Sequence, residues 1–289
     1  MGFEPTTSGT TNRRSNQLSY DRHTSPANGD QSRIDDSAWL HPLRERAFCT
    51  GLGFLQNKNW GWARCTRFSR GGGQAMGRRM DASGESSNTR LLSRAGVLRF
   101  PSPRLDLFVM RDFLSRERCE RLVALIEDSH RPSTIADYNG DDAFRTSSTC
   151  DLSPAVPEVA DLAAALHRLS GIDPAHAEPL QGQRYEPGQE FKAHTDYFEP
   201  GNPDYQTYCA VSGQRTWTFM VYLNDVEAGG ATRFKVIDKL IQPEAGKLVG
   251  WNNRRADGSP NPATLHHAMK VRKGRKYVIT QWYRERAWG

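Results

Sequence analysis

Apolar residues recur at helical spacing in two stretches that precede the strand-rich half of the chain. After a short strand predicted at 107–110, Ser115 is placed to cap a helix with an apolar stripe over 119–126. A second helix is predicted to open at Ser153 and to end before Gly171, because glycine suits the left-handed residue that follows many helices. Both stripes are typical of core packing.

From residue 180 onward the pattern changes to short runs rich in β-branched and aromatic residues, separated by turn dipeptides such as Pro187-Gly188. We predict strands at 181–185, 216–223, 247–251 and 276–283. No helix-length pattern separates these runs, so the strands are expected to pair antiparallel. The predicted class is α+β, with a jelly-roll core and supporting N-terminal helices.

The first 95 residues show neither the apolar spacing of a helix nor that of a strand, and they are rich in Ser, Thr, Gly, Asn and Arg. Such a composition cannot bury enough apolar surface to offset chain entropy, so we predict a disordered N-terminal segment at 1–95. The alternative is a basic arm that binds nucleic acid. Residues 2–21 also resemble the conceptual translation of a transfer-RNA gene at a false upstream start. We therefore expect an artefactual extension, with the native start at Met76 or Met80.

The positive net charge belongs to this segment and not to the rest of the chain. Residues 1–100 carry 15 Lys or Arg and 8 Asp or Glu, whereas residues 101–289 carry 24 and 25. The high isoelectric point therefore gives no reason to expect a nucleic-acid partner or an acidic membrane surface for the folded part.

Cysteine usage and hydropathy indicate the compartment. The five cysteines are odd in number and lack CxxC spacing, which favours a reduced, cytoplasmic setting over a disulfide framework. No run of about 18 apolar residues could span a bilayer, and the first thirty residues lack the apolar core of a secretion signal. We expect a soluble protein with no membrane partner.

Chemistry-bearing residues gather in the strand-rich half. His194 and Asp196 are two positions apart, so in an extended strand their side chains point the same way. His266 and His267 offer further imidazoles. Two histidines and one carboxylate that leave other positions open are typical of non-haem ferrous oxygenases. Lys276 begins an apolar strand, where a buried cation could pair with the carboxylate of a dicarboxylate 2-oxo acid.

These residues belong to linked motifs. Residues 185–198 read Tyr-x-x-Gly-Gln-x-Phe-x-x-His-x-Asp-Tyr-Phe, and residues 222–234 read Tyr-Leu-Asn-Asp-Val-Glu-x-Gly-Gly-x-Thr-x-Phe. Leu-His follows at 265–266, with a lysine ten residues after the histidine, and Arg-Thr-Ser-Ser precedes them at 145–148. From about 106 to 283 the chain resembles the prolyl 4-hydroxylase family of iron- and 2-oxoglutarate-dependent dioxygenases. The resemblance implies a double-stranded β-helix (jelly-roll) domain at 104–286.

The resemblance also implies roles for individual residues. His194, Asp196 and His266 would form the catalytic Fe(II) site, since the family's anchoring lysine lies ten residues after the ligand histidine. Lys276 would pair with the distal carboxylate of 2-oxoglutarate, and Tyr185 would hydrogen-bond the same co-substrate. On this assignment His267 faces away from the metal, because side chains alternate along a strand.

Four further residues carry expected roles around this site. Thr232 would assist co-substrate binding, and Trp282 would line the pocket. Arg145 and Glu178 occupy positions that resemble those near the family's peptide groove, so we expect substrate contacts there. The chain departs from the family at Lys235 and Lys270, where proline is usual; these changes affect loops and not the metal chemistry.

The implied activity is hydroxylation of an unactivated C–H bond, of a prolyl residue in a protein or peptide, with release of succinate and CO2. Fe(II), 2-oxoglutarate, O2 and L-ascorbate are the implied cofactors and co-substrates. A free amino acid or other small molecule is the alternative substrate. A nucleic-acid demethylase is disfavoured by the near-neutral charge and by the lysine, since that group typically uses arginine. A zinc hydrolase or a non-catalytic jelly-roll metal-binding module would give Lys276 no purpose at its spacing.

Overall fold

The computed structural model describes residues 86–134 and 143–288. Most of the segment that was predicted to be disordered or artefactual, together with both expected start sites, lies outside these residues. The last ten residues of that segment, 86–95, are described, and they differ from the prediction of disorder. A helix, α1 (Ser87–Leu92), and a strand, β1 (Val97–Arg99), form within or directly after them.

The burial of one leucine explains why this polar stretch folds. Leu91 is only 1% exposed and belongs to the main hydrophobic core, and α1 packs against a later helix, α3 (Pro157–Ser170). Ser86 caps α1 by accepting a hydrogen bond from the Thr89 amide. Composition alone misplaced the boundary because the contacts that stabilise α1 come from residues about seventy positions downstream.

The two predicted helices are present. In α2 (Arg116–Ser129) the Ser115 side chain accepts a hydrogen bond from the Arg118 amide, as the cap prediction requires. The helix α3 begins later than predicted because residues 153–156 form a turn, and it ends at Gly171, which has a left-handed φ of 69°. Besides α1, the helix α4 (Pro203–Cys209) was not predicted. Two 3-10 segments complete the helical elements of the described residues: η1 (Pro174–His176) and η2 (Pro262–Thr264).

A large antiparallel sheet forms the framework of the domain. The predicted strands lie within one residue of the observed ones at each end. In spatial order the sheet contains β1, β2 (Leu107–Met110), β11 (Leu248–Asn252), β7 (Arg215–Tyr222), β14 (Lys276–Arg284), β5 (Gln181–Tyr185), β4 (Ser148–Asp151) and β3 (Arg131–Pro132).

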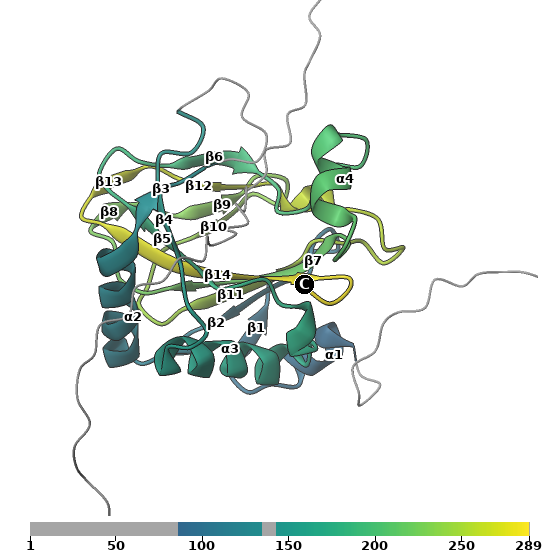
Figure 1. Ribbon diagram of the computed structural model, residues 1–289, viewed down its shortest axis with the longest axis horizontal. Helices are drawn as coiled ribbons and strands as arrows, with labels where there is room; N and C mark the ends of the chain where they lie inside the picture. Colours follow the sequence, from purple (N-terminus) through teal and green to yellow (C-terminus); the bar gives the residue numbers. More distant parts are fainter. Residues whose placement is uncertain (1–85, 135–142, 289) are drawn as a thin grey trace, which may run out of the picture. The chain divides into compact units, whose positions relative to one another are not determined.

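A smaller antiparallel sheet faces the large one, and the helices α1, α2 and α3 lie on the other side (Figure 1). The smaller sheet contains β10 (Lys239–Ile241), β9 (Thr232–Phe234), β12 (His266–Ala268) and β6 (Phe191–His194). A two-stranded ladder joins β13 (Val271–Lys273) to β8 (Ala228–Gly229). The arrangement confirms the predicted α+β class with a double-stranded β-helix core.

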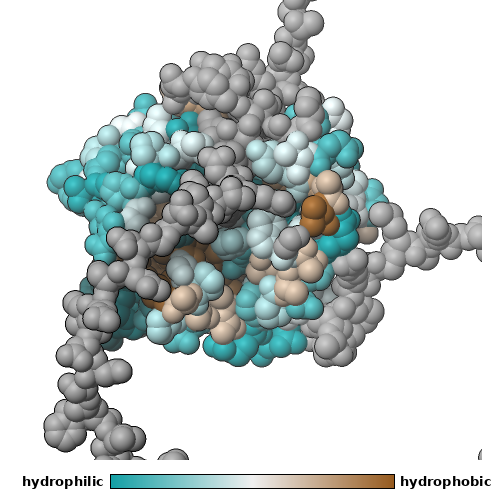
Figure 2. All heavy atoms as spheres, viewed as in Figure 1, coloured by the Kyte–Doolittle hydropathy of each residue, from teal (hydrophilic) through white to brown (hydrophobic). Residues whose placement is uncertain are grey.

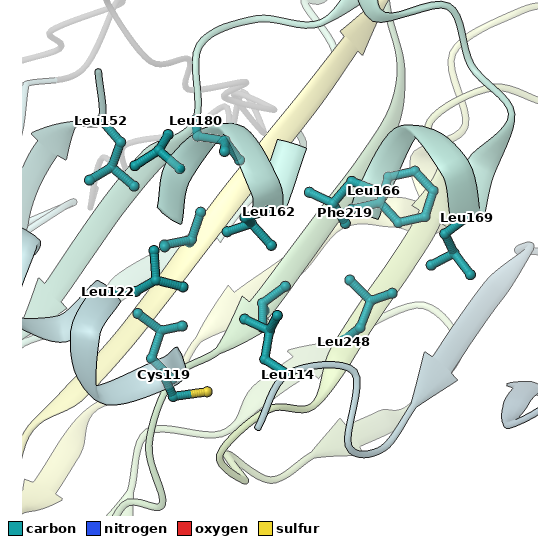
Figure 3. Packing of buried hydrophobic residues seen from close by; sticks show 14 of the residues in the cluster. Leu114, Cys119, Leu122, Leu152, Leu162, Leu166, Leu169, Leu180, Phe219 and Leu248 are labelled. Carbon is teal, nitrogen blue, oxygen red and sulfur yellow. The ribbon is translucent and has the colours of Figure 1, made fainter. Parts of the chain in front are cut away.

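Alternation along the central strands divides the hydrophobic core in two. Phe219 and Val221 in β7 face the helices, where they pack with leucines of α2 and α3 (Figure 3). Met220 and Tyr222 face the small sheet, where the second core contains aromatic side chains from both sheets. Polar residues on this second face are therefore buried between the sheets, which is where a ligand site can form.

The described residues on one face of the domain are mainly polar. Hydrophilic side chains predominate on the face shown in Figure 2, and the exposed large apolar residues, such as Leu98 in β1 and Leu240 in β10, are distributed over different elements. Within the described ranges no helix combines the length and the apolar character that crossing a bilayer requires. Cys119, Cys150 and Cys209 are buried free thiols.

Candidate functional site

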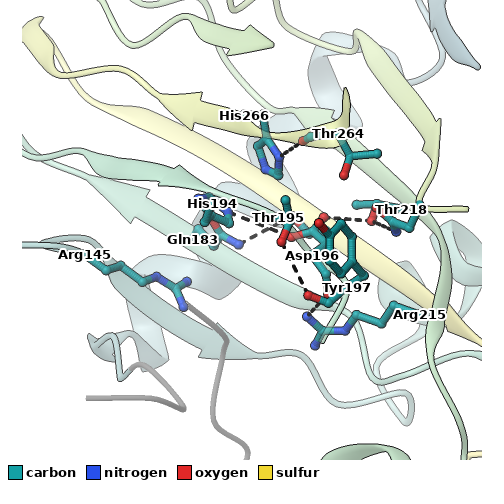
Figure 4. A network of polar contacts seen from close by, with 12 residues as sticks. Arg145, Gln183, His194, Thr195, Asp196, Tyr197, Arg215, Thr218, Thr264 and His266 are labelled. Carbon is teal, nitrogen blue, oxygen red and sulfur yellow. Dashed lines mark hydrogen bonds and ion pairs between the residues drawn. The ribbon is translucent and has the colours of Figure 1, made fainter. Parts of the chain in front are cut away.

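Two strands of the smaller sheet and the segment that follows one of them bring the three predicted ligand residues together (Figure 4). His194 ends β6 and His266 begins β12, and the two residues are direct partners in the antiparallel register. Asp196 completes a buried group in which one ligand atom from each residue lies within 4.8 Å of the others. The Nε2 atom of His194 is 3.9 Å from Oδ1 of Asp196.

One detail of the prediction was wrong. His194 and Asp196 were expected to share a strand, but β6 ends at His194 and Asp196 lies in the irregular segment that follows. Strand alternation therefore does not direct the carboxylate toward the imidazoles. Contacts from the large sheet do this instead, through hydrogen bonds made by Thr218 and Arg215.

Backbone carbonyls fix the tautomer of both histidines. Nδ1 of His194 lies 2.8 Å from the carbonyl oxygen of Lys192, and Nδ1 of His266 lies 2.9 Å from that of Thr264. A carbonyl oxygen only accepts, so each Nδ1 carries the proton and each Nε2 presents its lone pair. Burial lowers the pKa of His266 and, more strongly, that of His194, which keeps both imidazoles neutral and able to bind a metal.

A hollow extends from these ligands between the two sheets. The side chains predicted to bind the co-substrate or to line its pocket, which are Tyr185, Thr232, Lys276 and Trp282, all line it. The Tyr185 hydroxyl donates to Oε1 of Gln183 at 2.8 Å. The Thr232 hydroxyl accepts from Tyr222 at 2.6 Å.

Lys276 is the most unusual of these residues. Its side chain is 1% exposed, and its ammonium nitrogen has no hydrogen-bond partner among the described residues. It lies 4.9 Å from the ring centre of Tyr185 and 5.5 Å from that of Tyr222. Burial lowers the pKa of Lys276 to about 7. A buried cation without an acceptor is costly unless a ligand supplies the acceptor.

Two tryptophans that line the hollow also carry buried donors without a hydrogen-bond partner within the described ranges. The indole nitrogens of Trp251 and Trp282 are buried and have no partner in the described part of the chain. Three residues that line the hollow thus carry unsatisfied donors, beside a group of two neutral imidazoles and a carboxylate. Such a set fits a divalent iron together with a ligand that brings carboxylate oxygens, as 2-oxoglutarate does.

The histidine that follows His266 points elsewhere. Nε2 of His267 lies 2.8 Å from Oε2 of Glu190, and the side chain is 23% exposed. Lys270 lies 3.6 Å from the other oxygen of the same carboxylate. The structure therefore brings His266, and not His267, to the other two ligand residues.

Glu178, for which a substrate contact was expected, is buried among charged partners. Its side chain is fully enclosed, and its carboxylate accepts hydrogen bonds from Arg215 at 2.6 and 2.7 Å and pairs with Arg284 at 2.5 Å. Burial alone would raise the pKa of Glu178, but the charges of the two arginines outweigh it and lower the pKa. The negative charge of Glu178 is therefore balanced by Arg215 and Arg284 inside the protein.

Arg145, for which a substrate contact was also expected, is buried at 5% exposure. Its guanidinium donates to the hydroxyls of Ser147 and Thr149 at 3.1 Å and to the Gln181 side chain at 3.2 Å. It also lies 4.8 Å from the ring centre of Phe191, which lines the hollow. In this structure Arg145 supports the wall of the pocket.

Thr218, Trp251 and Arg215 were missed by the sequence analysis. Thr218 and Trp251 lie within predicted strands, and alternation could have placed both on the inner face. The contact between Thr218 and Asp196 joins two segments that no local pattern connects.

Comparisons with known proteins agree with this geometry. The model of the 2OG-Fe(II) oxygenase superfamily matches residues 180–284. Prolyl 4-hydroxylase 1 of Arabidopsis thaliana is 30% identical over 207 residues, which cover 64% of this chain and 70% of that protein. The human prolyl 4-hydroxylase subunit alpha-1 is 34% identical over 130 residues, 45% of this chain, and the match spans only 24% of the human protein.

A solved structure, the viral collagen prolyl hydroxylase of Paramecium Bursaria Chlorella virus-1 bound to 2OG, aligns with a TM-score of 0.48 and 24% identity. The alignment covers 62% of this chain and 95% of the viral chain. The family assignment rests on the sequence matches, of which the Arabidopsis thaliana protein is aligned over more than two thirds of its length. The chain belongs to the prolyl 4-hydroxylase family of 2OG-Fe(II) oxygenases.

Proposed function

We propose that this protein is an Fe(II)- and 2-oxoglutarate-dependent dioxygenase that hydroxylates a prolyl residue in a protein or peptide and releases succinate and CO2. The observation that carries the proposal is Lys276, a buried ammonium without a partner in the same hollow as the two histidines and the carboxylate. The prolyl substrate is proposed from the named activity of the relatives.

Each residue of the site has a defined task in this proposal. Nε2 of His194, Nε2 of His266 and Oδ1 of Asp196 would hold the iron. Fe(II), when bound, supplies the redox chemistry that couples the decarboxylation of 2-oxoglutarate to the hydroxylation of a C–H bond. Lys276 would pair with the distal carboxylate, and Tyr185 would turn its hydroxyl from Gln183 toward the same group.

The walls of the hollow provide the remaining requirement, which is to keep water away from the reacting atoms. The rings of Phe191, Trp251 and Trp282 and the side chains of Met220 and Val278 line it. A dry site strengthens the pairing of Lys276 with a carboxylate and limits side reactions. L-Ascorbate is proposed as the reductant that restores the iron after turnover without substrate.

The test is succinate formation from 2-oxoglutarate by the full chain, loaded with Fe(II) without oxygen and then exposed to O2, with and without a proline-rich peptide. Peptide-stimulated succinate with one oxygen atom gained on proline is the expected result. His267→Ala serves as the matched control for His266→Ala, which should abolish turnover. Turnover that no peptide stimulates would indicate a free amino acid or other small molecule as substrate. If the folded, iron-loaded protein forms no succinate, the proposed enzymatic activity is contradicted and a non-catalytic metal-binding module is indicated.

A further inference from the structure

A hydrogen bond from a residue of the large sheet holds the carboxylate of Asp196. The Thr218 hydroxyl lies 2.7 Å from Oδ2 of Asp196, and both side chains are buried. Since an ionised carboxylate only accepts hydrogen bonds, the hydroxyl must donate. This bond engages Oδ2 and leaves Oδ1, which lies 3.9 Å from Nε2 of His194, on the side of the two imidazoles.

A second residue fixes the direction of this bond. Nδ2 of Asn253 lies 2.9 Å from the Thr218 hydroxyl oxygen. Because the hydroxyl proton is directed to Asp196, its oxygen must accept, so the amide nitrogen and not the amide oxygen of Asn253 faces it. Asn253 is 0% exposed, and its backbone is paired on both sides, to Thr216 and to Asn261.

The cost of this arrangement is visible in the same residue. Oδ1 of Asn253 is buried and has no partner among the described residues. An unsatisfied buried acceptor costs about 1–3 kcal/mol. An apolar residue would avoid that cost, so the Asn253 donor and the Thr218 hydroxyl are expected to have a role beyond packing.

We infer that Thr218 and Asn253 are positioning residues of the metal site. Asn253 orients the Thr218 hydroxyl, and this hydroxyl holds the Asp196 carboxylate with Oδ1 toward the metal. These two hydrogen bonds, which we call the relay, orient a carboxylate that strand alternation cannot orient, because Asp196 lies beyond the end of β6. The relay rests on the proposed function, because it needs a metal at the group formed by His194, Asp196 and His266.

The test measures Co(II) binding to the full-length, metal-free protein by visible absorption, independently of turnover. Thr218→Val removes the hydroxyl at nearly constant volume and should weaken Co(II) binding about 10–100-fold, the usual effect of losing a partner of a metal ligand. Thr218→Ser keeps the donor and should restore most of the affinity. Asn253→Ala should weaken binding in the same direction.

Thr216→Val is the matched control. Thr216 lies on the same face of the same strand, and its buried hydroxyl donates to the carbonyl of Tyr283 at 3.1 Å, away from Asp196. Equal Co(II) affinity in the Thr216→Val and Thr218→Val variants would overturn the relay. A wild-type protein that binds no Co(II) would instead contradict the proposed function itself. Thermal unfolding of both variants separates loss of affinity from loss of fold.

Discussion

The uncompensated charge of Lys276 gives a prediction that needs neither iron nor substrate. Replacement of Lys276 by methionine keeps the length of the side chain and removes the ammonium. The unfolded chain has the ordinary lysine pKa of about 10.4, whereas burial lowers the pKa of Lys276 in the folded protein to about 7. Lys276→Met should therefore stabilise the ligand-free protein at neutral pH.

The size of the effect follows from proton linkage. Between pH 7 and about 10.4 the unfolded state binds more protons at this site than the folded state, so the free energy of unfolding of the wild type rises with pH. A shift of this size corresponds to on the order of 4 kcal/mol at and below pH 7, and it decreases by about 1.4 kcal/mol for each pH unit above 7. The advantage of the variant should be largest at pH 7 and nearly absent by pH 10.

Urea unfolding of both proteins at pH 7, 8, 9 and 10, without metal or 2-oxoglutarate, measures this difference. Lys273→Met is the control, because Lys273 is exposed on β13 and pairs with Glu227 at 2.7 Å. The control should show no stabilisation at any pH. A difference between wild type and Lys276→Met that stays constant with pH would refute the assignment of a buried, unsatisfied ammonium.

The same substitution should have the opposite effect on ligand binding. Loss of one partner of a buried charged pair typically costs about 2–5 kcal/mol, so Lys276→Met should weaken 2-oxoglutarate binding by at least about thirtyfold, as measured by calorimetry. Stabilisation of the free protein together with weaker binding distinguishes a ligand-binding lysine from a structural one. A variant that is both less stable and equally able to bind 2-oxoglutarate would contradict the role of Lys276.

Three further predictions concern other parts of the domain. His266→Ala should abolish Co(II) binding and 2-oxoglutarate turnover, whereas His267→Ala should retain most of both; equal losses would refute the choice of ligand. Glu178→Gln should destabilise the protein by about 3 kcal/mol in urea unfolding, because it leaves buried arginine charge without its partner. Gly182→Ala should cost about 1–3 kcal/mol, since its Cβ would lie 2.6 Å from Cγ1 of Ile126; an unchanged midpoint of unfolding would show that α2 can shift.

Regular strands and helix caps could be predicted because their causes are local. Ser115 precedes a helical apolar stripe, and β5 has the range that its residue types predict. The start of the domain could not be predicted in this way, because α1 depends on Leu91 packing against α3. Similarly, α4 is a short helix whose sequence shows no sustained apolar period.

The residues of the candidate site also differ in whether the sequence alone could reveal their roles or whether those roles depend on contacts with distant residues. His266 could be separated from His267 because the resemblance ties the ligand to a lysine ten positions away, and the two side chains point to different surroundings. The substrate contact expected for Glu178 came from the resemblance alone, and nothing near it in the sequence reveals the two arginines that surround it. Those arginines lie on β7 and β14, which only the sheet brings beside Glu178.

The position of Asp196 shows why these non-local contacts matter for the chemistry. Asp196 lies outside any strand, so side chains from β7 and the loop before it must define its place. The Gln214 side chain accepts from the Phe198 amide at 2.8 Å and donates to the Phe198 carbonyl at 2.7 Å. Arg215, held by Glu178, donates to the carbonyl of Asp196 at 3.4 Å. The buried charges thus support the backbone of the third ligand while Thr218 orients its carboxylate, and both depend on the register of the large sheet.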